Sequence, residues 1–471
     1  MQTLSARRLD MLLAEWRGTA PAYSALADRV RLLILDGRIP IGTRLPAERE
    51  LAQQLHLSRT TVSATFARLR DAGYLSSTRG SGSVAMLPAG EPVAAELPGQ
   101  GLLDFSKAAL PAAHQLADAA TRAAASLPTF LGSPGYDPVG LPQLRQAIAD
   151  RYAARGLPTD PAQVMVTIGA QHAIALLSRV ILDRSDTAVV ETPSYPHAYE
   201  ALRSAARRLV PVNVTTSGGW DEDALRQAFA RTHPALAYVM PDFQNPTGCT
   251  MGSEQRTELL RTASKHGTVV VADETMAELA IDDDGARPLP LAAYGPAVLI
   301  GSLGKTVWGG LRIGWIRAEP DLVQRLVRAR FSHDLGTPIL EQLIAADVLG
   351  QYESILAERG RRLREGRDQL ASLLRDRLPG WDVPGVRGGL ALWVGLGQPV
   401  SSQLTLAARN EGLLLAAGPR FGLDGAFERF LRIPFSYPEE QTERAVDILA
   451  RCWKALPLAQ PSETGYLAEV V

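Results

Sequence analysis

Cysteine is scarce in this chain, which has two among its 471 residues, Cys249 and Cys452. Two cysteines cannot form a disulfide framework, and these two lack the spacing of metal ligands, so we expect neither a disulfide scaffold nor a metal site. The sequence has no run of about 18 apolar residues, which argues against a membrane-spanning helix. Its first residues, MQTLSARRLDML, lack an apolar core long enough for a signal peptide. We therefore expect a protein of the reducing cytoplasm that has no membrane partner.

A large net charge of either sign is missing as well. The formal net charge is −1, and the chain is 46% hydrophobic and 21% charged. This composition is typical of soluble globular proteins and supplies enough apolar residues for a large core. The length exceeds that of one ordinary domain and predicts two or three folding units. Because an overall balance can hide local asymmetry, the charge has to be compared segment by segment.

Residues 21–85 have the pattern of a winged helix-turn-helix domain. Apolar residues recur at helical spacing from Tyr23, and a second helical stretch, RLPAERELAQQL, has Pro46 where a first turn tolerates proline. A third stretch begins at Ser58, a natural N-cap, and ends at Gly73. Two short β-prone runs around a glycine-rich turn follow in YLSSTRGSGSVA. Three helices followed by a hairpin indicate a winged helix.

The third helix begins with side chains that suit contact with DNA. Arg59, Thr60 and Thr61 lie in its first turn, where they would face base edges and phosphates in a major groove. Arg79 lies at the wing tip. Residues 21–85 contain nine arginines and five acidic residues, a local charge of +4 that suits phosphate contact. A capped helix start with solvated arginines would give the same three helices, but the wing makes that alternative less favoured.

The same segment resembles the GntR family. The resemblance rests on the string GRIPIGTRLPAERELAQQLHLSRTTVSATFARLRDAGYL, and it implies that double-stranded promoter DNA is a partner. One departure is Ser63, where some members of the family carry a basic residue. The DNA-binding residues that the helix start, the wing and the resemblance imply are Arg49, Ser58, Arg59, Thr60, Thr61, Arg79 and Gly80.

A composition change separates this unit from the rest of the chain. Residues 86–102 are rich in proline, glycine and alanine without periodicity, which predicts a linker. A second, larger domain is expected over 103–457. Residues 1–20 form an N-terminal extension and 458–471 a tail, both without a motif.

Apolar runs alternate with helical stretches from about residue 160. The strand-like runs are VMVTI, TAVVE, ALAYVM, TVVVAD, AVLIGS and LRIGWIRA. This alternation predicts an α/β domain with a mostly parallel central sheet covered by helices on both faces. In such sheets ligands bind beyond the carboxyl ends of the strands, so functional residues should follow the strands directly.

Residues that could bind a ligand do follow these runs. At the first of them, Gly169, Ala170 and Gln171 begin a helix whose free N–H groups favour an anion. The others are Tyr195 after TAVVE, Asn245 in PDFQNPTG, Asp273 at the end of TVVVAD, Ser302 and Lys305 after AVLIGS, and Arg312 at the second position of LRIGW. Taken singly, each has a structural alternative, such as a turn former, a helix cap, a core tyrosine or a solvated lysine. A phosphate-binding P-loop is rejected for GSLGKT because Leu299 stands where its first glycine would be.

Together these groups meet the requirements of pyridoxal 5′-phosphate (PLP). Its aldehyde needs an amine, its phosphate needs N–H and cationic donors, its ring nitrogen needs a carboxylate, and its ring needs a stacking partner. The chain from 103 to about 455 resembles the fold type I aminotransferases. The string SLGKTVWGGLRIGW is similar to their lysine and phosphate-arginine motif, and PDFQNPTG to their Asn-Pro-x-Gly turn.

The resemblance implies a role for each residue. Lys305 would form the internal aldimine, Asp273 would pair with the ring nitrogen, and Tyr195 would stack on the ring. Asn245 would donate to the ring hydroxyl, alone or helped by Thr275, because Thr275 and Met276 stand where many relatives have a tyrosine. The phosphate would be held by Gly169, Ala170, Gln171, Ser302 and Arg312, with Tyr136 acting on a neighbouring subunit, and Arg432 would bind the carboxylate of an amino-acid ligand.

A GntR-type head before an aminotransferase-like domain resembles the MocR regulators over almost the whole chain. This resemblance implies a domain-swapped homodimer that binds promoter DNA and senses PLP or an amino compound at Lys305. The competing hypothesis is an active aminotransferase with an appended DNA-binding module. A third, a regulator that ignores PLP, is disfavoured by the presence of Lys305. We expect a sensor rather than an enzyme, and a slow half-transamination stays open.

Overall fold

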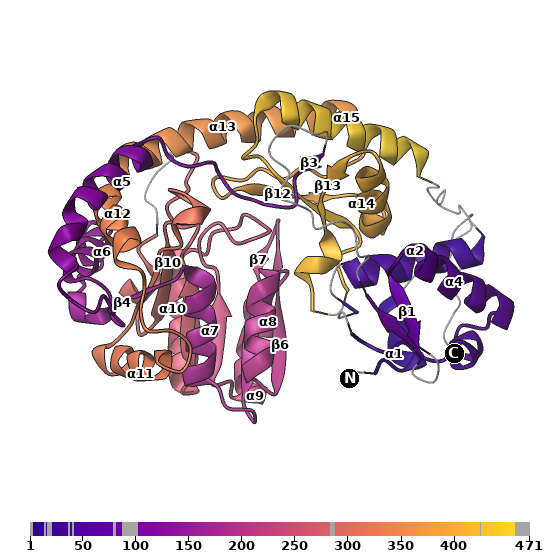
Figure 1. The fold of residues 1–471 in the computed structure, drawn as a ribbon, viewed down its shortest axis with the longest axis horizontal. Coiled ribbons are helices and arrows are strands. Elements are labelled where there is room, and N and C mark those ends of the chain that lie inside the picture. Colours follow the sequence, from indigo (N-terminus) through magenta and orange to yellow (C-terminus); the bar gives the residue numbers. More distant parts are fainter. Residues whose placement is uncertain are drawn as a thin grey trace. The chain divides into compact units, whose positions relative to one another are not determined.

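The computed structural model describes residues 3–13, 16, 21–35, 38–39, 42–78, 82–86, 102–282, 288–423 and 425–456. These residues form two compact units. One comprises Met1–Leu103 with Val400–Leu414 and Ile448–Val471, and the other Asp104–Pro399 with Leu415–Asp447 (Figure 1). Most of the expected linker, the whole tail, Arg79 and Gly80 lie outside the described residues.

The N-terminal part, which we call the head, contains the expected three helices and hairpin. The helices are α2 (Ala22–Leu35), α3 (Glu48–Gln54) and α4 (Arg59–Asp71), and an antiparallel hairpin joins β1 (Leu75–Thr78) to β2 (Gly82–Ala85). The third helix starts as expected, since the Ser58 side chain accepts a hydrogen bond from the Thr61 N–H at 3.0 Å.

The expected position of Pro46 is wrong. Helix α3 begins at Glu48 after an extended Ala47, so Pro46 precedes the helix and does not lie in its first turn. The cause is the hairpin: the Leu45 N–H donates to the Ser83 carbonyl at 2.8 Å, which keeps the chain extended up to the helix.

A further helix, α1 (Ala6–Leu13), forms within the expected N-terminal extension and packs into the head. Its Leu9, Leu12 and Leu13 are buried in the same core as residues of α2, α3 and α4. The Leu13 carbonyl accepts a hydrogen bond from Arg29 Nε at 2.9 Å, and the Leu12 carbonyl accepts one from Arg38. Burial and capping by these arginines make α1 an integral part of the head.

The large unit is organised around an eight-stranded sheet within the described residues. The strand order is β4-β11-β10-β9-β8-β5-β6-β7. Strands β6, β5, β8, β9 and β10 run parallel, whereas β11 is antiparallel to both of its neighbours and β7 is antiparallel to β6. The mostly parallel sheet expected from the sequence is confirmed. Its strands are β4 (Val164–Thr167), β5 (Thr187–Thr192), β6 (Arg208–Thr215), β7 (Gly219–Trp220), β8 (Leu236–Val239), β9 (Val269–Asp273), β10 (Val298–Ser302) and β11 (Gly314–Arg317).

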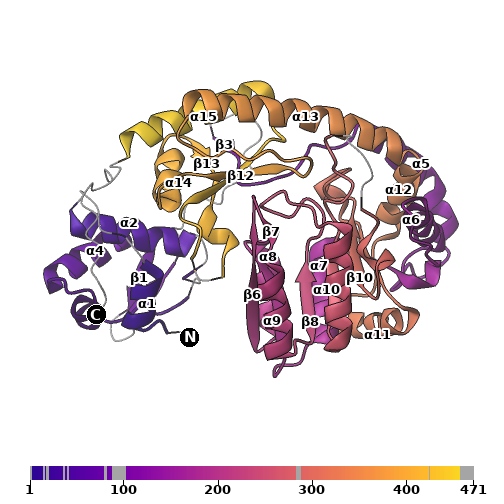
Figure 2. The ribbon, with the colours of Figure 1, turned by 180° about the vertical axis from the view of Figure 1, so that it is seen from behind.

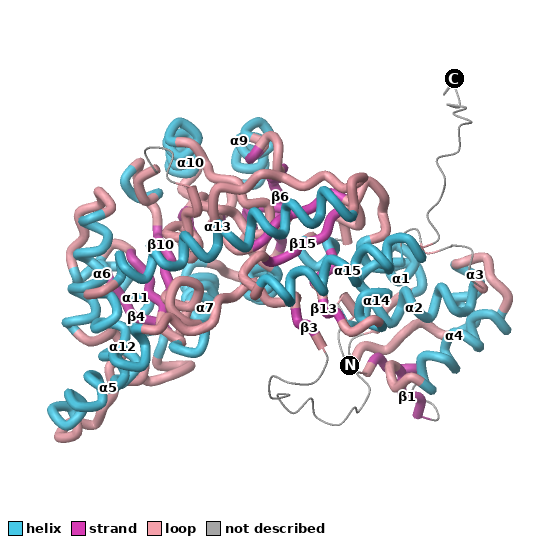
Figure 3. Tube along the Cα trace, turned by 90° about the horizontal axis from the view of Figure 1, so that it is seen from above, coloured by secondary structure: helices cyan, strands magenta, loops and turns pink. Residues whose placement is uncertain are grey.

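Helices cover both faces of this sheet. Helices α7 (Ala170–Ile181) and α8 (Pro196–Ala205) lie side by side on one face, and α9 (Glu222–Thr232) and α10 (Ser253–Lys265) cover the other (Figures 1, 2 and 3). The other helices are α5 (Gln115–Ser126), α6 (Pro142–Ala154), α11 (Pro320–Arg330), α12 (Ile339–Leu349), α13 (Tyr352–Arg377), α14 (Ser401–Asn410) and α15 (Glu439–Ala455). The remaining strands are β3 (Leu103–Asp104), β12 (Ala391–Gly395), β13 (Leu413–Leu414), β14 (Ala416–Ala417) and β15 (Phe430–Pro434). No helix of the described chain is both long and apolar enough to cross a membrane.

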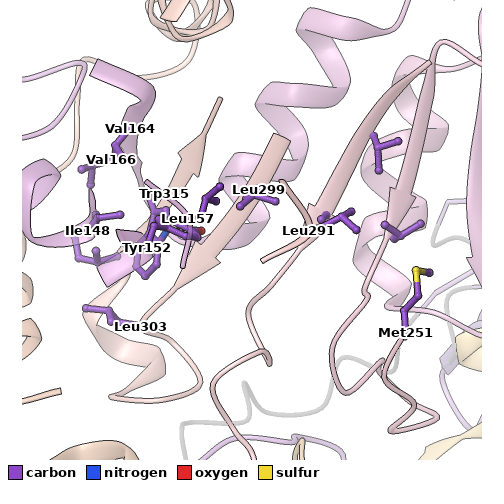
Figure 4. Close-up of a cluster of buried hydrophobic side chains, with 14 of the residues drawn as sticks. Ile148, Tyr152, Leu157, Val164, Val166, Met251, Leu291, Leu299, Leu303 and Trp315 are labelled. Atoms are coloured by element: carbon purple, nitrogen blue, oxygen red, sulfur yellow. The ribbon is translucent and has the colours of Figure 1, made fainter. Parts of the chain in front are cut away.

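The packing of the large unit's core explains the glycine in the strand AVLIGS. Trp315 of β11 lies opposite Gly301 of β10, and a Cβ on Gly301 would come 2.2 Å from the Trp315 ring. The indole Nε1 lies 3.1 Å from the Tyr152 hydroxyl, in the buried cluster that also contains Leu157 and Leu299 (Figure 4). Gly301 therefore lets the Trp315 ring lie flat on the strand that leads to Ser302.

Candidate cofactor site and nucleic-acid interface

Strand direction brings the expected phosphate residues to one edge of the sheet. Strands β4 and β10 end at this edge, and β11 begins there, because Gly314 pairs with both Ser302 and Thr167. The expectation that Arg312 is the second residue of a strand is wrong. β11 starts at Gly314, and Arg312 lies before it in the left-handed region at φ 56°, after the short 3-10 turn Gly309–Leu311.

The Arg312 guanidinium lies over the start of α7. Its Nη2 donates to the Ile168 carbonyl at 2.9 Å, and a Cβ on Gly169 would come 2.6 Å from the same nitrogen. Gly169 is the N-cap at φ 81°, and a Cβ on Gly314 would come 2.9 Å from the Ala170 nitrogen. Both glycines are thus required for this close approach, because any other residue at either position would collide with its neighbour.

The first turn of α7 offers a site for an anion. The N–H groups of a helix's first turn have no intrahelical acceptor and lie at the positive end of the helix dipole. The Gln171 side chain is directed elsewhere, since its Nε2 donates to the His197 carbonyl at 3.0 Å. Ser302 is the last residue of β10, and its hydroxyl accepts a hydrogen bond from the Gly304 N–H at 3.0 Å. Helix N–H groups, a guanidinium and a hydroxyl together suit a phosphate.

Asp273 ends β9 as a buried carboxyl with two donors. It accepts hydrogen bonds from the Tyr238 hydroxyl at 2.6 Å and from the Thr275 N–H at 3.0 Å. Burial raises the pKa of Asp273, and Tyr238, Thr275 and the charge of Lys305 partly oppose that rise. A cationic N–H group placed against this carboxyl would stabilise its charged form. Thr275 thus acts on Asp273 here, and its contact with the cofactor's ring hydroxyl stays a prediction.

Lys305 is not a solvated surface lysine. Its side chain is half-buried, and its Nζ donates to the Ala108 carbonyl at 2.8 Å. Burial lowers the pKa of Lys305 to about 8, helped by the like charge of Arg432 and opposed by Asp273. A lowered pKa leaves a larger neutral, nucleophilic fraction of the amine near neutral pH.

Arg432, on β15, is a buried cation with an unused donor. One Nη donates to the Ser106 carbonyl, and the guanidinium lies 4.8 Å from the centre of the Phe421 ring. Its Nε is buried and has no hydrogen-bond partner within the described residues. Burial lowers the pKa of Arg432 to about 10. An unsatisfied buried guanidinium N–H favours an anionic ligand such as a carboxylate.

Tyr195 and Asn245 occupy the loops expected for them. Tyr195 is the N-cap of α8, and burial together with the charge of Asp273 raises the pKa of its hydroxyl to about 12. Asn245 lies half-buried in the turn between β8 and α10. Tyr136 is not brought to this site within one chain: it lies before α6 and is 69% exposed.

Sequence reasoning missed two buried residues that join the loops of Tyr195 and Asn245. Gln244 Nε2 donates to the Pro193 carbonyl at 2.7 Å and to Glu191 at 3.1 Å, while its Oε1 accepts from the Thr247 N–H at 3.0 Å. The Glu191 carboxyl also accepts from Trp220 Nε1 and the Met240 N–H. Glu191 is the charged last residue of the apolar run TAVVE. Its charge was the signal that could have identified it, because charged residues are rarely buried without partners.

The residues of this edge fit PLP. The close approach of Arg312 to Gly169 leaves a cradle of N–H donors, Asp273 supplies a carboxylate, and Lys305 supplies an amine of lowered pKa. The unpaired Nε of Arg432 offers a separate place for a carboxylate.

The head presents a polar helix start to solvent. Arg59 and Thr60 are exposed in the first turn of α4, Arg49 is exposed on α3, and the Ser58 hydroxyl lies 2.7 Å from the hydroxyls of both Thr60 and Thr61. Five of the nine arginines of residues 21–85 bind acidic side chains or main-chain carbonyls within the head: Arg29, Arg31, Arg38, Arg68 and Arg70. As candidates for contact with DNA, the exposed arginines at the helix starts are therefore more informative than the total charge of the segment.

Comparison with known families agrees with both units. The model of aminotransferases of class I and II matches residues 100–449. The chain belongs to the aminotransferase class I and II family. The gntR family of bacterial regulatory proteins matches residues 22–84, so this class I and II aminotransferase homologue carries a GntR helix-turn-helix domain.

Similar proteins divide according to which units they cover. The HTH-type transcriptional regulator YisV of Bacillus subtilis is 26% identical over 91% of this chain and 95% of its own length. The probable rhizopine catabolism regulatory protein MocR of Rhizobium meliloti is 30% identical over 79% of this chain and 80% of its own length. The structure of LysN, an alpha-aminoadipate aminotransferase of Thermus thermophilus, covers 75% of this chain and 92% of its own, with 30% identity and a TM-score of 0.68. This aminotransferase homologue therefore has the GntR–MocR regulator architecture, with PLP as the cofactor of its family.

The lowered pKa of Lys305 predicts how cofactor loading depends on pH. Below the pKa of about 8 the amine is charged and unreactive, so the rate at which cofactor-free protein takes up PLP should rise about tenfold per pH unit and level off above pH 8. Arg432→Met removes a like charge and should move this profile to higher pH. Stopped-flow absorbance measures it.

An exposed arginine of α7 provides the control for this prediction. Arg179→Met should leave the midpoint unchanged, since Arg179 lies in the last turn of α7, at the end opposite the anion site. A parent profile that still rises above pH 10, or equal midpoints for the Arg432 variant and the parent, would contradict the cause given for the shift.

Proposed function

We propose that the protein is a PLP-responsive transcriptional regulator that binds promoter DNA through α3, α4 and the wing. The observation that carries this proposal is the presence, in one chain, of side chains that fit PLP and of a GntR domain with exposed arginines at its helix starts. Because promoter DNA is the partner, we place the protein in the cytoplasm.

The large unit would hold PLP through residues at the edge of the sheet. PLP supplies an aldehyde, with which an amine condenses with loss of water, and an electron-accepting ring. Lys305 would provide that amine and Asp273 would face the ring nitrogen. Tyr195 would lie against the ring and Asn245 would donate to its hydroxyl. The phosphate would be held by Gly169, Ala170, Gln171, Ser302 and Arg312.

The sensed molecule would be PLP itself or an amino compound that carries a carboxylate. Such a compound can place its carboxylate on the unpaired Nε of Arg432 while its amine competes with that of Lys305. Release of Lys305 would favour a different arrangement of the large unit, and a ligand that binds one arrangement better than another shifts the equilibrium between them.

An active aminotransferase with an appended DNA-binding module is the second candidate. It is favoured by the same donor set, which includes every group needed to bind an amino acid at the cofactor, and by the fold shared with LysN. The two candidates differ in whether the protein converts an amino donor and a keto acid over many turnovers per site.

We further propose that two copies pair through an apolar patch of the large unit. The patch consists of Leu131, Tyr136, Phe331 and Leu335, which are 70%, 69%, 56% and 49% exposed. Its two segments lie together, since a Cβ on Gly336 would come 2.3 Å from the Asp137 carbonyl oxygen. Large exposed apolar patches mark interfaces, and a self-complementary one suits a two-fold dimer. Pairing would bring Tyr136 to a neighbouring subunit. The domain swap implied by the MocR resemblance stays a prediction.

Arg59→Ala should weaken binding to a duplex from the region upstream of the protein's own gene about tenfold, because one contact to DNA is lost. PLP loading should stay intact. Arg68→Ala is the matched control, since Arg68 lies nine residues later on α4, half a circle around the helix, and pairs with Asp28 at 3.9 Å. Fluorescence anisotropy measures both affinities, and equal losses in the two variants would remove Arg59 from the interface.

Lys305→Ala should abolish the visible absorbance band of attached PLP and the effect of PLP on DNA binding, while binding in the absence of PLP is kept. Lys265→Ala, at an exposed lysine in the last turn of α10, should behave as the parent. If PLP changes DNA affinity equally in the parent and Lys305→Ala, sensing at Lys305 is wrong. If the parent converts an amino donor and a keto acid over many turnovers per site, the aminotransferase candidate replaces the sensor.

Leu131→Glu should raise the dimer dissociation constant at least about tenfold, because it places a charge in the buried centre of the proposed interface. Sedimentation velocity of dilute protein measures this change. Leu289→Glu, at a leucine exposed elsewhere on the large unit, should have no effect. A monomeric parent, or a dimer that tolerates Leu131→Glu, would show that the patch has another role.

A further inference from the structure

Residues 104–108, which we call the strap, are the first described part of the large unit after the expected linker. Two of its main-chain carbonyls hold the two residues that would bind ligand. The Ala108 carbonyl accepts from Lys305 Nζ at 2.8 Å, and the Ser106 carbonyl accepts from a guanidinium nitrogen of Arg432. One short segment therefore accepts hydrogen bonds from both cations.

Within the described residues, the strap is also held at its start, where β3 pairs with β13, and by the side chain of Tyr437. The Tyr437 hydroxyl donates to the Lys107 carbonyl at 2.8 Å and to the Asp104 carbonyl. The Tyr437 ring stacks on Phe105, with ring centres 4.0 Å apart. Within the strap, Lys107 Nζ lies 2.9 Å from the Asp104 carboxylate, which also accepts from the Ser106 N–H. These contacts hold residues 104–107 together.

The chain just beyond the strap is anchored independently of the ligand residues. The Pro111 carbonyl accepts from Arg359 at 2.7 Å, and the Ala113 N–H donates to the Val307 carbonyl at 3.0 Å. A loss of the bonds to Lys305 and Arg432 would therefore loosen the residues between β3 and Pro111, while Pro111 and Ala113 stay fixed.

We propose that the strap is the element through which ligand binding at Lys305 and Arg432 is passed to the linker and the head. This inference rests on the proposed function and specifies its regulation. An aldehyde that takes the Lys305 amine removes a donor from the Ala108 carbonyl. A carboxylate that binds the Arg432 Nε and the neighbouring Nη2 together competes with the Ser106 carbonyl for that Nη2. PLP alone therefore removes the hydrogen bond at Ala108. An amino acid that displaces Lys305 from PLP frees Lys305 to bind Ala108 again, and its carboxylate removes the hydrogen bond at Ser106 instead.

The direct test is hydrogen exchange, followed by mass spectrometry, on the full-length protein. Peptides that cover residues 102–111 are compared without ligand, with PLP, and with PLP and L-alanine as the probe amino acid. We expect exchange in this segment to become several-fold faster with PLP, and to stay faster than in the ligand-free protein with both ligands, because one of the two hydrogen bonds is lost in each state. Unchanged or slower exchange in PLP-loaded protein overturns the proposal.

Tyr437→Phe tests the strap without touching Lys305 or Arg432. Loss of two hydrogen bonds should speed exchange of residues 102–111 in the ligand-free protein, and so reduce the further change caused by PLP to less than half of that in the parent. Tyr294→Phe is the matched control, because its hydroxyl also makes two hydrogen bonds in the large unit, to Ser253 and to the Leu289 N–H. It should keep the parent's response.

The outcomes separate the strap from the proposed function. If the parent shows no absorbance band with PLP, the PLP site itself is wrong. If the parent binds PLP and Tyr437→Phe responds as fully as Tyr294→Phe, the strap does not transmit binding. Should Tyr437→Phe fail to fold, Lys107→Ala replaces it, since Lys107 is exposed and removes only the ion pair to Asp104. The same reduction is then expected, and its absence overturns the proposal.

Discussion

The close approach of Gly169 and Gly314 is the constraint on which the cofactor edge depends. A Cβ on Gly314 would lie 2.7 Å from the Gly169 carbonyl carbon, so the main chains of β11 and of the α7 start are in direct contact. This contact exists because β11 is inserted antiparallel between β4 and β10. It places the residue two positions before the strand, Arg312, over free helix N–H groups. If β11 ran parallel to its neighbours, Arg312 would lie at the opposite edge of the sheet.

The sequence predicts best what depends on position along a strand. Asp273 and Ser302 lie at the ends of β9 and β10, and Ala170 begins α7, as the apolar runs and the helix start indicated. The side-chain hydrogen bonds between segments far apart in the sequence could not be predicted. The partners Tyr238 and Asp273 are 35 residues apart, and Gln244 and Glu191 are 53 apart. Each of these pairs depends on which strands become neighbours, and that order is set by crossover connections whose geometry leaves no periodic signal.

The head shows the same division between local and distant effects. The N-cap at Ser58 and the start of α4 follow from a few adjacent residues and were predicted. The start of α3 was misplaced because a hydrogen bond from Leu45 to Ser83 keeps the preceding residues extended. The charge surplus of the segment is likewise a poor guide to its surface. Arg29 and Arg38 serve as caps for α1, so their charge supports folding of the head and not its contact with DNA.

Helix α1 also bears on how such chains can be assembled from parts. The match to the gntR family begins at residue 22, yet the core of the head includes Leu9, Leu12 and Leu13, and the Leu4 N–H binds the Arg44 carbonyl. A genetic exchange of heads with a crossover at codon 22 would leave a foreign α1 against this core, with leucines shaped for another partner. Successful exchanges between genes of this kind should therefore have crossover points upstream of the codon for residue 3, so that α1 is inherited together with the rest of the head.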